Sequence, residues 1–535
     1  MQYRQAAIEQ FVVTAQQMRD IEGRIFAAGI PVAALMEKVA GLITHRIMQL
    51  FPVSLSSPLS SHRIGVLVGP GHNGGDALVV ARELHFRGYE IYVYHPLFKQ
   101  KELTSQHLKY VESLGVPCYQ SVDKLKNCDL FIDGLFGFGL QRTITEPITS
   151  AIDLINQLNK PVVSIDVPSG LHTDTGEVLG IAIRATYTLC LGLWKLGLLQ
   201  ESALEYVGKA ELIDFDIPLA DIEAILGGSP KIKRFTTQIA RSIIGKEKTS
   251  TNSTLLPRKL VTHKYKEGHL LLVCGSRRYA GAAILTSLGA RASGVGLLTV
   301  AVPESLKHLM ISKLPEALII GCPETESGAI SQLLSPDNID LNSFTAIACG
   351  PGLTVDAISV VKQVLNSNTS LILDADGLNI LSKMETSWLE QGAIEKTRKA
   401  TTIFTPHPGE FSRLFPKIDE KKQDRIKAVK KAAKQSGAVV LLKGPRTAIA
   451  NPQGDIWINP ASTPALARGG SGDVLTGLMG GLLAQSSSRD IAPDIVTALA
   501  AWWHSQAGIL AAVERTELGV DAFTLTQYLM RVVSF

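Results

Sequence analysis

Short apolar runs alternate along the chain with longer segments in which apolar residues recur every three or four positions. Runs of this length are typical of buried strands, and the longer spacing is typical of amphipathic helices. Strands that alternate with helices predict a parallel α/β sheet, and the pattern occurs in both halves of the chain. Two predicted helices, 16–29 and 31–51, come before the first run. The predicted strands are at 64–69, 90–96, 129–137, 161–170, 269–275, 296–302, 346–352, 371–377, 401–410 and 438–444.

The pattern weakens between about residues 219 and 258, where the polar stretch GKEKTSTNSTLLPR (245–258) has the composition of a linker. A chain of 535 residues is also too long for one hydrophobic core. We therefore predict a Rossmann-like three-layer α/β/α domain over 1–240, a linker over 241–257, and a second α/β domain over 258–535, in which helix-rich sequence closes the chain.

Composition limits the classes of partner. The chain is 45% hydrophobic and 19% charged, which is typical of a folded globular protein, and its net charge is only +4. This charge is too small to favour binding to nucleic acid or to a membrane, so we expect small-molecule partners. The basic stretch 421–437 carries apolar residues at helical spacing and predicts the solvated side of an amphipathic helix.

The cysteines and the apolar tracts indicate in which cellular compartment the protein is expected. None of the six cysteines forms a C-x-x-C pair, which favours buried thiols in a reducing compartment. The most apolar tract, 181–200, is interrupted by Arg184 and Lys195 and does not predict a membrane span. We expect a cytoplasmic protein and a homo-oligomer.

The segment GPGHNGGDA (69–77) follows a predicted strand and contains G-x-G-x-x-G. Two features argue against a dinucleotide fingerprint. The next strand, 90–96, has no acidic residue at its far end to bind a ribose, and Asp76 would place a carboxylate near the pyrophosphate. The glycines therefore predict a site for another ligand.

Three loops follow strands in the first half and should meet at one edge of the sheet. They contain Asn73 and Asp76, then Asp133 with Gly137, Gly139 and Arg142, then Asp166 and Ser169. Their oxygens suit a hard cation, and a glycine loop beside an arginine suits phosphate. The alternatives are that each Asp caps a helix or turn, and that the glycines only permit a positive φ.

In the second half, ARGGSGDVLTGLMGG (467–481) opens a helix with a glycine cluster. Backbone amides of Gly470 to Gly472 would form an anion hole for a phosphoryl group, and Asp473 could deprotonate the acceptor hydroxyl. A simple glycine turn with a favourable acid in the first helical turn is the alternative. The chain has neither a Walker A sequence nor a protein-kinase motif set, so the phosphoryl chemistry belongs to another class.

Other predicted strand ends of this half could complete the site. The loop 443–447 places a lysine and a hydroxyl where nucleotide could bind, and His407 and Glu410 lie in a proline-stiffened loop. Asp374, Asp376 and Asn379 could bind Mg²⁺ or cap a helix.

The motifs LMEKVAG, GPGHNGGDA, DGLFGFGLQR and DVPSG, in this order, make residues 10–235 resemble the epimerase domain of the bifunctional NAD(P)H-hydrate repair enzymes. The resemblance implies interconversion of the R and S hydrates of NADH and NADPH (NADHX and NADPHX), with K⁺ bound by Asn73, Asp133 and Ser169. Cation binding would lower the pKa of Asp133, which favours Asp166 as the proton-transfer group. The family usually reads GPGNNGGDG, so His72 and Ala77 depart from it. The implied hydrate contacts are His72, Asn73, Gly74, Gly75, Asp76, Gly137, Phe138, Gly139, Leu140, Gln141, Arg142, Thr143 and Asp166.

The second half resembles the ribokinase-like ADP- or ATP-dependent NAD(P)H-hydrate dehydratase domain over 258–535, through ACGPGL, DADGLN, TPHPGE, LKGPRT and GGSGDVLTG. The resemblance implies Mg²⁺-assisted phosphorylation of the S-hydrate and elimination of phosphate, with Asp473 catalytic and with ADP favoured over ATP. The implied hydrate contacts are Ala282, Gly352, His407 and Asp473. The implied nucleotide contacts are Lys443, Gly444, Pro445, Arg446, Thr447, Gly469, Gly470, Ser471 and Gly472.

Two other functions share these features. A ribokinase-like kinase of a vitamin precursor or sugar, with an N-terminal nucleotide-binding module, would use the same phosphoryl chemistry. The first half could also bind a nucleotide or a protein without catalysis, which His72 and Ala77 leave open.

Overall fold

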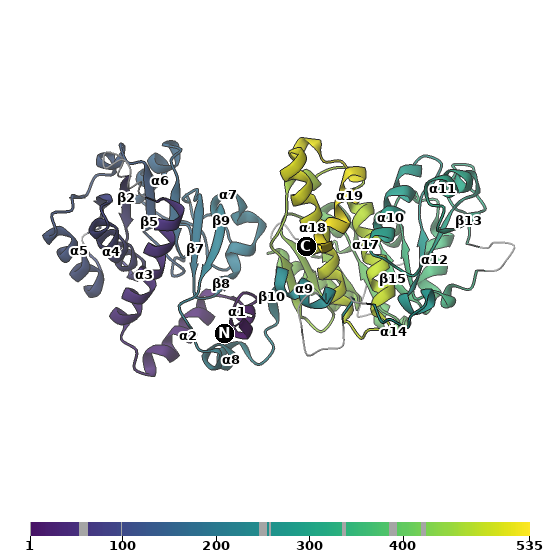
Figure 1. Cartoon of the computed structure of the whole chain (residues 1–535), viewed down its shortest axis with the longest axis horizontal. Coiled ribbons are helices and arrows are strands. Elements are labelled where there is room, and N and C mark those ends of the chain that lie inside the picture. Colours follow the sequence, from purple (N-terminus) through teal and green to yellow (C-terminus); the bar gives the residue numbers. More distant parts are fainter. Residues whose placement is uncertain are drawn as a thin grey trace. The chain divides into compact units, whose positions relative to one another are not determined.

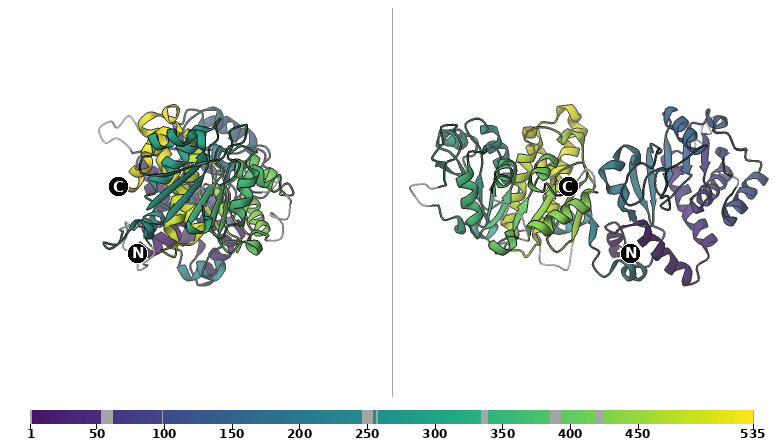
Figure 2. Two further views of the ribbon diagram at one scale, coloured as in Figure 1. Left: turned by 90° about the vertical axis from the view of Figure 1, so that its right-hand side faces the viewer. Right: turned by 180° about the vertical axis from the view of Figure 1, so that it is seen from behind.

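The computed structural model describes residues 2–52, 62–97, 99–245, 254–255, 258–333, 339–384, 393–418 and 424–534. The chain divides into two compact units, Met1–Pro230 and Lys231–Phe535. Figures 1 and 2 show that each unit is a sheet with helices on both sides. Both units are therefore α/β, as the alternation of runs and periodic segments predicts.

The sheet of the first unit has seven parallel strands in the order β4-β3-β2-β5-β6-β7-β9. Its strands are β2 (Arg63–Val68), β3 (Glu90–Tyr94), β4 (Cys118–Tyr119), β5 (Leu130–Gly134), β6 (Val162–Ile165), β7 (Tyr187–Leu191) and β9 (Lys209–Ile213). Its helices are α1 (Gln2–Ile8), α2 (Ala15–Ala27), α3 (Val32–Leu50), α4 (His72–Phe86), α5 (Glu102–Ser113), α6 (Ile148–Gln157), α7 (Leu204–Val207) and α8 (Leu219–Leu226).

Alternation along β2 builds a core on each face of this sheet. Val66 and Val68 belong to the cluster that includes buried residues of α3 and α4. Leu67 points the other way and joins the cluster that contains Ile152 of α6. Successive side chains of a strand face opposite sides, so one apolar run supplies both cores of a three-layer unit.

A small second sheet fixes the N-terminal helices. β1 (Val12–Val13) pairs in parallel with β8 (Trp194–Lys195), which follows β7. Helix α2 then begins with a capping box, in which Thr14 and Gln17 each accept a hydrogen bond from the other's backbone N–H. Asp174 accepts a further hydrogen bond from Ala15 N at 2.7 Å. These contacts tie α2 to loops that follow the strands of the main sheet.

The second unit contains a ten-stranded sheet in the order β10-β19-β18-β17-β16-β15-β14-β11-β12-β13, antiparallel only at β17–β18 and β18–β19. Its strands are β10 (Ile232–Arg234), β11 (His269–Val273), β12 (Leu297–Pro303), β13 (Leu318–Cys322), β14 (Ala346–Cys349), β15 (Ser370–Leu373), β16 (Thr402–Phe404), β17 (Val439–Leu442), β18 (Thr447–Ala450) and β19 (Ile456–Asn459). Its helices are α9 (Thr237–Ile244), α10 (Ala280–Ala292), α11 (Lys307–Lys313), α12 (Ile358–Asn366), α13 (Asp376–Leu381), α14 (Ala393–Thr397), α15 (Pro408–Leu414), α16 (Arg425–Ser436), α17 (Ser471–Ser486), α18 (Pro493–Arg515) and α19 (Ala522–Ser534).

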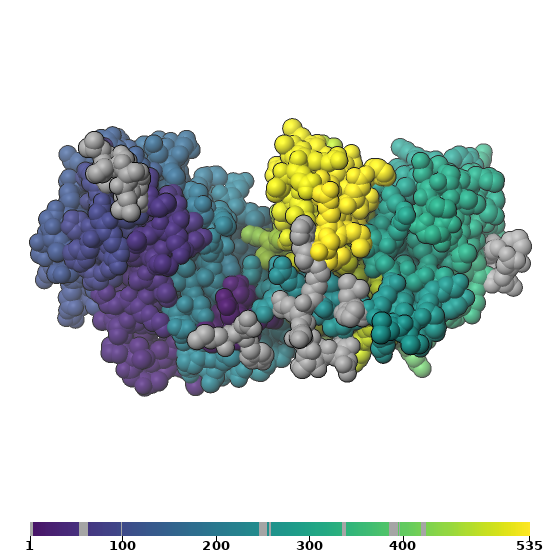
Figure 3. All heavy atoms as spheres, in the orientation of Figure 1, coloured from purple at the N-terminus to yellow at the C-terminus, as the bar shows by residue number. Residues whose placement is uncertain are grey.

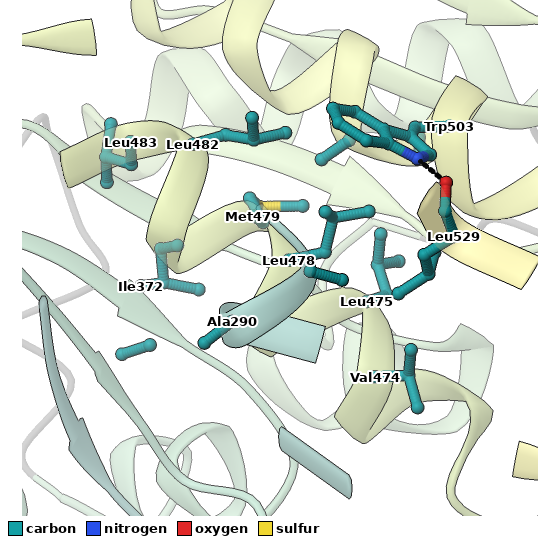
Figure 4. Packing of buried hydrophobic residues seen from close by; sticks show 14 of the residues in the cluster. Ala290, Ile372, Val474, Leu475, Leu478, Met479, Leu482, Leu483, Trp503 and Leu529 are labelled. Carbon is teal, nitrogen blue, oxygen red and sulfur yellow. Dashed lines mark hydrogen bonds between the residues drawn. The ribbon is translucent and has the colours of Figure 1, made fainter. Parts of the chain in front are cut away.

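Helix α17 lies at the centre of the second core. Its apolar side chains pack among residues of α10, β15, α18 and α19 (Figure 4), and Trp503 Nε1 donates a hydrogen bond to the Leu529 carbonyl at 2.6 Å. Glycines let α10 and α17 touch along their backbones, since a Cβ on Gly477 would lie 1.8 Å from the Thr286 carbonyl oxygen. The helices α18 and α19 cover one face of this unit, in yellow in Figure 3. The position of the α17 N-terminus is therefore set by close packing.

Several predictions about local structure can be compared with the fold. The two N-terminal helices, the predicted strands and the helix-rich end are present. The basic segment forms α16 with Ile426, Val429, Ala432 and Ala433 buried, which confirms its amphipathic character; residues 421–423 lie outside the described residues. The strands β1, β4, β7, β8, β9, β10, β13, β18 and β19 were not among the predicted ones.

The division between the units falls at Pro230, before the boundary that composition suggested at 240. Strand β10 pairs with β19, and Ala240 and Ile244 of α9 belong to the second core, so residues 231–244 are part of the second unit. The predicted linker 241–257 thus begins inside α9, and most of its remainder lies outside the described residues.

All six cysteines are free thiols, and five of them are buried. Burial raises the pKa of each thiol above its usual value, to about 12 for Cys118 and to about 11 for Cys190. Among the described helices, no single one is long and apolar enough to cross a membrane; α2 and α3, which meet at a 119° bend, reach that length and composition only when taken together.

Candidate active sites

A cavity of about 740 Å³ lies in the first unit at the carboxyl ends of the strands. Its walls come from α2, α3, the N-terminus of α4 and the loops after β5, β6 and β7. In an open parallel sheet this edge is where ligands bind. The predicted hydrate contacts that line it are His72, Asn73, Asp76, Gly137, Phe138, Gly139, Leu140, Gln141, Arg142 and Asp166.

Three of the predicted contacts do not line this cavity. Gly74 and Gly75 are buried in the first turn of α4, and a Cβ on Gly74 would lie 2.0 Å from the Gly69 carbonyl oxygen. Thr143 is exposed beyond the loop. Gly74 thus permits the close approach of α4 to its preceding turn, and Gly75 leaves room for Met36 of α3, since a Cβ there would lie 2.7 Å from the Met36 Cε. This packing places His72, Asn73 and Asp76 at the cavity.

Asp166 is held by three groups. Its Oδ1 lies 2.6 Å from Lys195 Nζ and accepts a hydrogen bond from Leu191 N at 3.3 Å, while Oδ2 accepts one from Phe138 N at 3.0 Å. Both charged side chains are almost fully buried, and Lys195 Nζ also donates to the Leu191 carbonyl. Burial lowers the pKa of Lys195, but the Asp166 carboxylate outweighs it and the net direction is upward. The pair is a buried ammonium–carboxylate contact facing the cavity.

Two further carboxyl groups line the same cavity, Glu22 on α2 and Asp76 on α4. Burial raises the pKa of Glu22 to about 7, with Lys195 opposing the shift and Asp166 adding to it. Burial also raises the pKa of Asp76 well above its usual value, and the charges of Asp166 and Glu22 add to it. Like charges that share a site cannot all stay ionised, so protonated carboxyl groups are present near neutral pH.

Of the residues predicted to hold K⁺, Asn73 lines this cavity, whereas Asp133 and Ser169 are buried and are not part of its wall. Asp133 is fully buried and accepts four hydrogen bonds: from Ser164 Oγ (2.8 Å), Ser169 N (2.9 Å), Ser169 Oγ (2.6 Å) and Leu135 N (3.3 Å). Burial raises the pKa of Asp133, and the hydrogen bonds from Ser169 oppose that shift. Asn73 Nδ2 is buried without a partner among the described residues. An amide turned by 180° would offer its oxygen there, so Asn73 suits a cation, whereas Asp133 would have to release a hydroxyl donor.

Sequence reasoning missed Arg19, Glu22, Lys101 and Lys195, which all line the cavity. Arg19 and Lys195 lie over the ring of Phe138, at 6.0 and 5.6 Å from its centroid. In the sequence, Lys195 stands out only because it interrupts the apolar tract 181–200. A lysine inside such a tract is itself a signal, because a buried ammonium needs a counter-ion.

In the second unit, the carboxyl ends of β15 and β17 bring Asp374 and Lys443 together. Lys443 Nζ lies 2.6 Å from Asp374 Oδ1, and Thr476 Oγ1 of α17 donates to Asp374 Oδ2 at 2.5 Å. Burial lowers the pKa of Lys443, but Asp374 outweighs it and the net direction is upward. A Cβ on Gly472 would lie 3.4 Å from Lys443 Nζ, so this cation stands beside the first turn of α17.

Asp473 lies in that first turn and is half-buried. Gly470 precedes the helix with φ of 88°, a left-handed conformation that favours glycine, and no side chain caps the helix. Ser471 N donates a hydrogen bond to the Arg468 carbonyl at 3.3 Å, whereas the amides of Gly472 and Asp473 have no acceptor among the described residues and lie at the positive helix end, as an anion hole requires. Burial raises the pKa of Asp473 to about 7; Asp374 and Asp376 add to the shift and Lys443 opposes it. A carboxyl group with this pKa is suited to general base catalysis near neutral pH.

His407 and Glu410 extend the site along the next strand end. His407 caps α15 with its Nδ1, which accepts a hydrogen bond from Gly409 N at 3.0 Å, and its Nε2 lies 3.3 Å from Glu410 Oε1. Burial raises the pKa of Glu410, against the opposing charge of Lys443. His407 is exposed, with its ring reachable from solvent.

Ala282 and Gly352 are neighbours, since a Cβ on Gly352 would lie 2.8 Å from that of Ala282. Gly352 has φ of 66° and follows β14. Two of the predicted hydrate contacts thus adjoin one another, and Tyr279 lies beside them, with its Cβ 2.9 Å from the position of a Cβ on Gly352.

The loop 443–447 is shaped by its own hydrogen bonds. Thr447 Oγ1 donates to the Gly444 carbonyl at 2.9 Å, and Arg446 donates to the Pro460 carbonyl. Burial and the nearby Arg234 lower the pKa of Arg446 to about 10, and its Nε has no partner among the described residues. Pro445 and Gly469 are exposed, and Gly444, Gly470 and Gly472 are partly exposed.

The carboxylates predicted for Mg²⁺ have partners within the chain. Asp376 Oδ2 accepts a hydrogen bond from Thr354 N at 2.9 Å, and Asn379 Nδ2 donates to its Oδ1 at 3.3 Å. Within the described ranges, no group of three or more His, Cys, Asp or Glu side chains could by itself hold a metal ion. A magnesium ion here would therefore rely on nucleotide phosphates and water for most of its ligands.

Trp502, Trp503 and His504 of α18 are buried packing residues. His504 has a second contact that sequence did not suggest: its Nε2 lies 2.9 Å from the Ser471 carbonyl oxygen and 3.2 Å from Ser471 Oγ. Burial lowers the pKa of His504 to about 4, so the ring is neutral and donates to the carbonyl. This contact ties the start of α17 to α18.

Two family models match the chain: that described as NAD(P)H-hydrate dehydratase over residues 270–531, and that described as YjeF-related protein N-terminus over residues 32–197. Bifunctional NAD(P)H-hydrate repair enzymes from Synechocystis sp. and Thermosynechococcus vestitus are 51% and 50% identical, each over 97% of this chain and over 94% and 96% of their own. A solved ADP/ATP-dependent NAD(P)H-hydrate dehydratase from Bacillus subtilis, co-crystallised with ATP/Mg²⁺, is 33% identical and covers 53% of this chain and 95% of its own, with a TM-score of 0.44.

Proposed function

This chain belongs to the family of bifunctional NAD(P)H-hydrate repair enzymes, and on that premise we propose that the first unit epimerises the hydrates and the second dehydrates the S form. The two reactions complement one another. An S-specific dehydratase would leave the R hydrate untouched, whereas epimerisation feeds it into the same site. A kinase of a vitamin precursor or sugar is not favoured, because the relatives match across both units.

In the second unit, Asp473 takes the proton of the C6 hydroxyl as the hydroxyl oxygen bonds to phosphorus and the bond to the departing nucleotide breaks. Amides of Gly470 and Gly472 stabilise the charge on the transferring group, and the amide of Ser471 joins them by releasing its hydrogen bond to the Arg468 carbonyl. Lys443 stands beside Gly472 and compensates the negative charge of Asp374. Phosphate then leaves C6 with the bonding electron pair, which hydroxide does poorly, and loss of a ring proton restores NADH or NADPH.

The remaining contacts in the second unit follow the loops at the same edge of the sheet. Residues 443–447 and 469–472 bind the adenine nucleotide, ADP or ATP, while Ala282, Gly352 and His407 contact the hydrate. Asp374 and Asp376 are the carboxylates that would face Mg²⁺, in part through water. When bound, Mg²⁺ spreads the charge of the transferring phosphoryl group.

In the first unit, the cavity binds the hydrate through residues of 72–76, residues of 137–143 and Asp166. Asn73, Asp133 and Ser169 bind K⁺, for which the unpartnered buried amide of Asn73 gives the best support. No step of the reaction is assigned to this ion. Assembly into a homo-oligomer and a cytoplasmic location remain predictions.

The observation that carries this proposal is the position of Asp473. It is half-buried at an uncapped helix N-terminus, and the charges of Lys443 and Asp374 act on its carboxyl group. The test is incubation of mixed R and S hydrates with K⁺ or Na⁺, Mg²⁺ and either nucleotide. Recovery of NADH absorbance beyond the S fraction is expected for the wild type, and none for Asp473→Asn. Accumulation of a stable phosphorylated product without NADH would indicate a kinase instead.

A further inference from the structure

The cavity of the first unit gathers three carboxyl groups, Glu22, Asp76 and Asp166, around the single buried amine of Lys195. They come from four separate elements: α2, α4, the end of β6 and β8. Arg19 also faces Glu22, while Lys101 and Arg142 line the exposed margin of the cavity. When several carboxyl groups surround one cation, their pKa values are pushed apart. One carboxylate stays ionised beside the cation, and the others keep a proton.

Asp166 has the features of the fixed anion. Lys195 Nζ, Leu191 N and Phe138 N all donate to it, and its backbone adopts φ of 70°. A left-handed Asp is retained only where its surroundings hold it in place. Proton transfer through Asp166 would require release of one of these donors.

Glu22 is placed differently. In the described part of the chain, neither of its carboxyl oxygens has a hydrogen-bond or ion-pair partner, yet the side chain is only half exposed and lines the cavity. An unpartnered carboxyl group in such a wall is free to bind the ligand. Its surroundings keep a substantial protonated population at neutral pH, because burial raises the pKa of Glu22 to about 7.

We propose that Glu22 is the catalytic proton donor of the epimerase site and that Asp166, held by Lys195, is the anion that stabilises the cationic ring. This inference rests on the epimerase function proposed above. The C6–O bond breaks with its electron pair on oxygen, which takes the Glu22 proton and becomes water, while the N1 lone pair forms an N1–C6 double bond. Water then returns to C6 on the other side of the ring, and its proton goes back to the Glu22 carboxylate, either directly or by way of Asp76.

The proposal fixes the sign of the pH dependence. The hydrate must meet a protonated Glu22, so kcat/KM for epimerisation falls as the pH rises through about 7. Replacing Glu22 by Gln removes the proton donor without changing the size of the side chain. We expect kcat for R-to-S conversion to fall about 10²-fold or more, with KM changed less than about threefold and with the decline above neutral pH abolished.

The test compares pH profiles of R-to-S conversion for the wild type, Glu22→Gln, Glu22→Asp and Asp166→Asn. Glu22→Asp keeps an acid and should keep the decline at reduced kcat, and it covers the case in which Glu22→Gln fails to fold. Asp166→Asn should lower kcat while keeping the decline. The matched control is Asp20→Asn, which removes an exposed carboxylate from the same helix and should leave the profile unchanged.

Dehydration of pure S hydrate reports the amount of folded second unit in each sample, and thermal unfolding compared with the wild type reports whether the first unit is folded. If Glu22→Gln epimerises with the wild-type profile, or if Asp166→Asn alone abolishes the decline, the assignment of Glu22 is overturned. If the wild type does not interconvert R and S at all, the proposed function fails instead, and the two failures are distinct.

Discussion

At the scale of single residues, Asp473 shows how catalysis and stability oppose one another in the second unit. Its carboxyl group is half-buried near Asp374 and Asp376, and burial raises its pKa to about 7. The ionised form needed for base catalysis is thus the form that the folded protein disfavours. A raised folded pKa means that stability falls as the pH rises from the ordinary value of 3.8 through about 7.

Two effects of pH follow for Asp473. In the wild type, kcat/KM for dehydration should rise as the pH passes about 7 and the base ionises. Asp473→Asn should lower kcat about 10³-fold and flatten this rise, yet increase the free energy of unfolding by about 1–3 kcal/mol at pH 8. Initial rates of NADH formation and denaturant unfolding measure the two quantities. Asp356→Asn, at an exposed carboxylate in the same unit, should change neither; a destabilised Asp473→Asn would contradict this account.

The residues that sequence identified are those whose signal is local. Each of these sites is a single contiguous stretch of sequence. The glycine turn before Asp473 forms an uncapped helix N-terminus, and residues 137–142 form part of a cavity wall. Glu22 and Lys195 could not be found in this way, because their proposed roles depend on Asp166. That residue follows β6 and is distant from both in the sequence. The order of β5, β6 and β7 in the main sheet and the pairing of β1 with β8 bring these segments together.

At the scale of elements, the contact between α10 and α17 sets where the proposed anion hole lies. Gly289, Gly477 and Gly481 allow the two backbones to approach, and a Cβ on any of them would lie within about 2.2 Å of the facing helix. Glycine normally weakens a helix interior, so these glycines are explained by packing and not by helix propensity.

Gly477→Ala should therefore force the helices apart. We expect a loss of about 2–4 kcal/mol in the free energy of unfolding and a lower dehydratase kcat, because α17 carries Asp473 on its first turn. Gly281→Ala is the matched control: this glycine is exposed on α10, an added methyl group would meet nothing within 4 Å, and the change should be neutral or stabilising. Equal melting temperatures for the two variants would contradict the packing argument.

At the scale of the whole molecule, the alternation of strands and helices was enough to predict two α/β units, but not where the first one ends. Composition marks the polar stretch after residue 245, whereas β10 and α9 already belong to the second unit. Strand β10 is three residues long, too short to leave a periodic signal, and its partner β19 lies far along the chain.

A fragment that begins at Lys231 should be more stable than one that begins at Arg258. The longer fragment keeps the β10–β19 pairing and the edge contact between Phe235 and Trp457, whose ring centroids are 5.7 Å apart. The shorter one exposes Trp457 and loses the apolar residues of α9 from the core. Thermal unfolding and S-hydrate dehydration compare the two fragments, and indistinguishable melting would argue that β10 and α9 contribute nothing to the second unit.

The burial of the cysteine thiols affects how this enzyme withstands oxidants. Oxidants and electrophiles attack thiolates, and here five thiols are enclosed and all six are held in the protonated form by burial. An enzyme that restores reduced nicotinamide carriers has most use when reducing power is short, and its folded state would then offer peroxide little to modify. Oxidation of the five enclosed thiols would have to wait for unfolding.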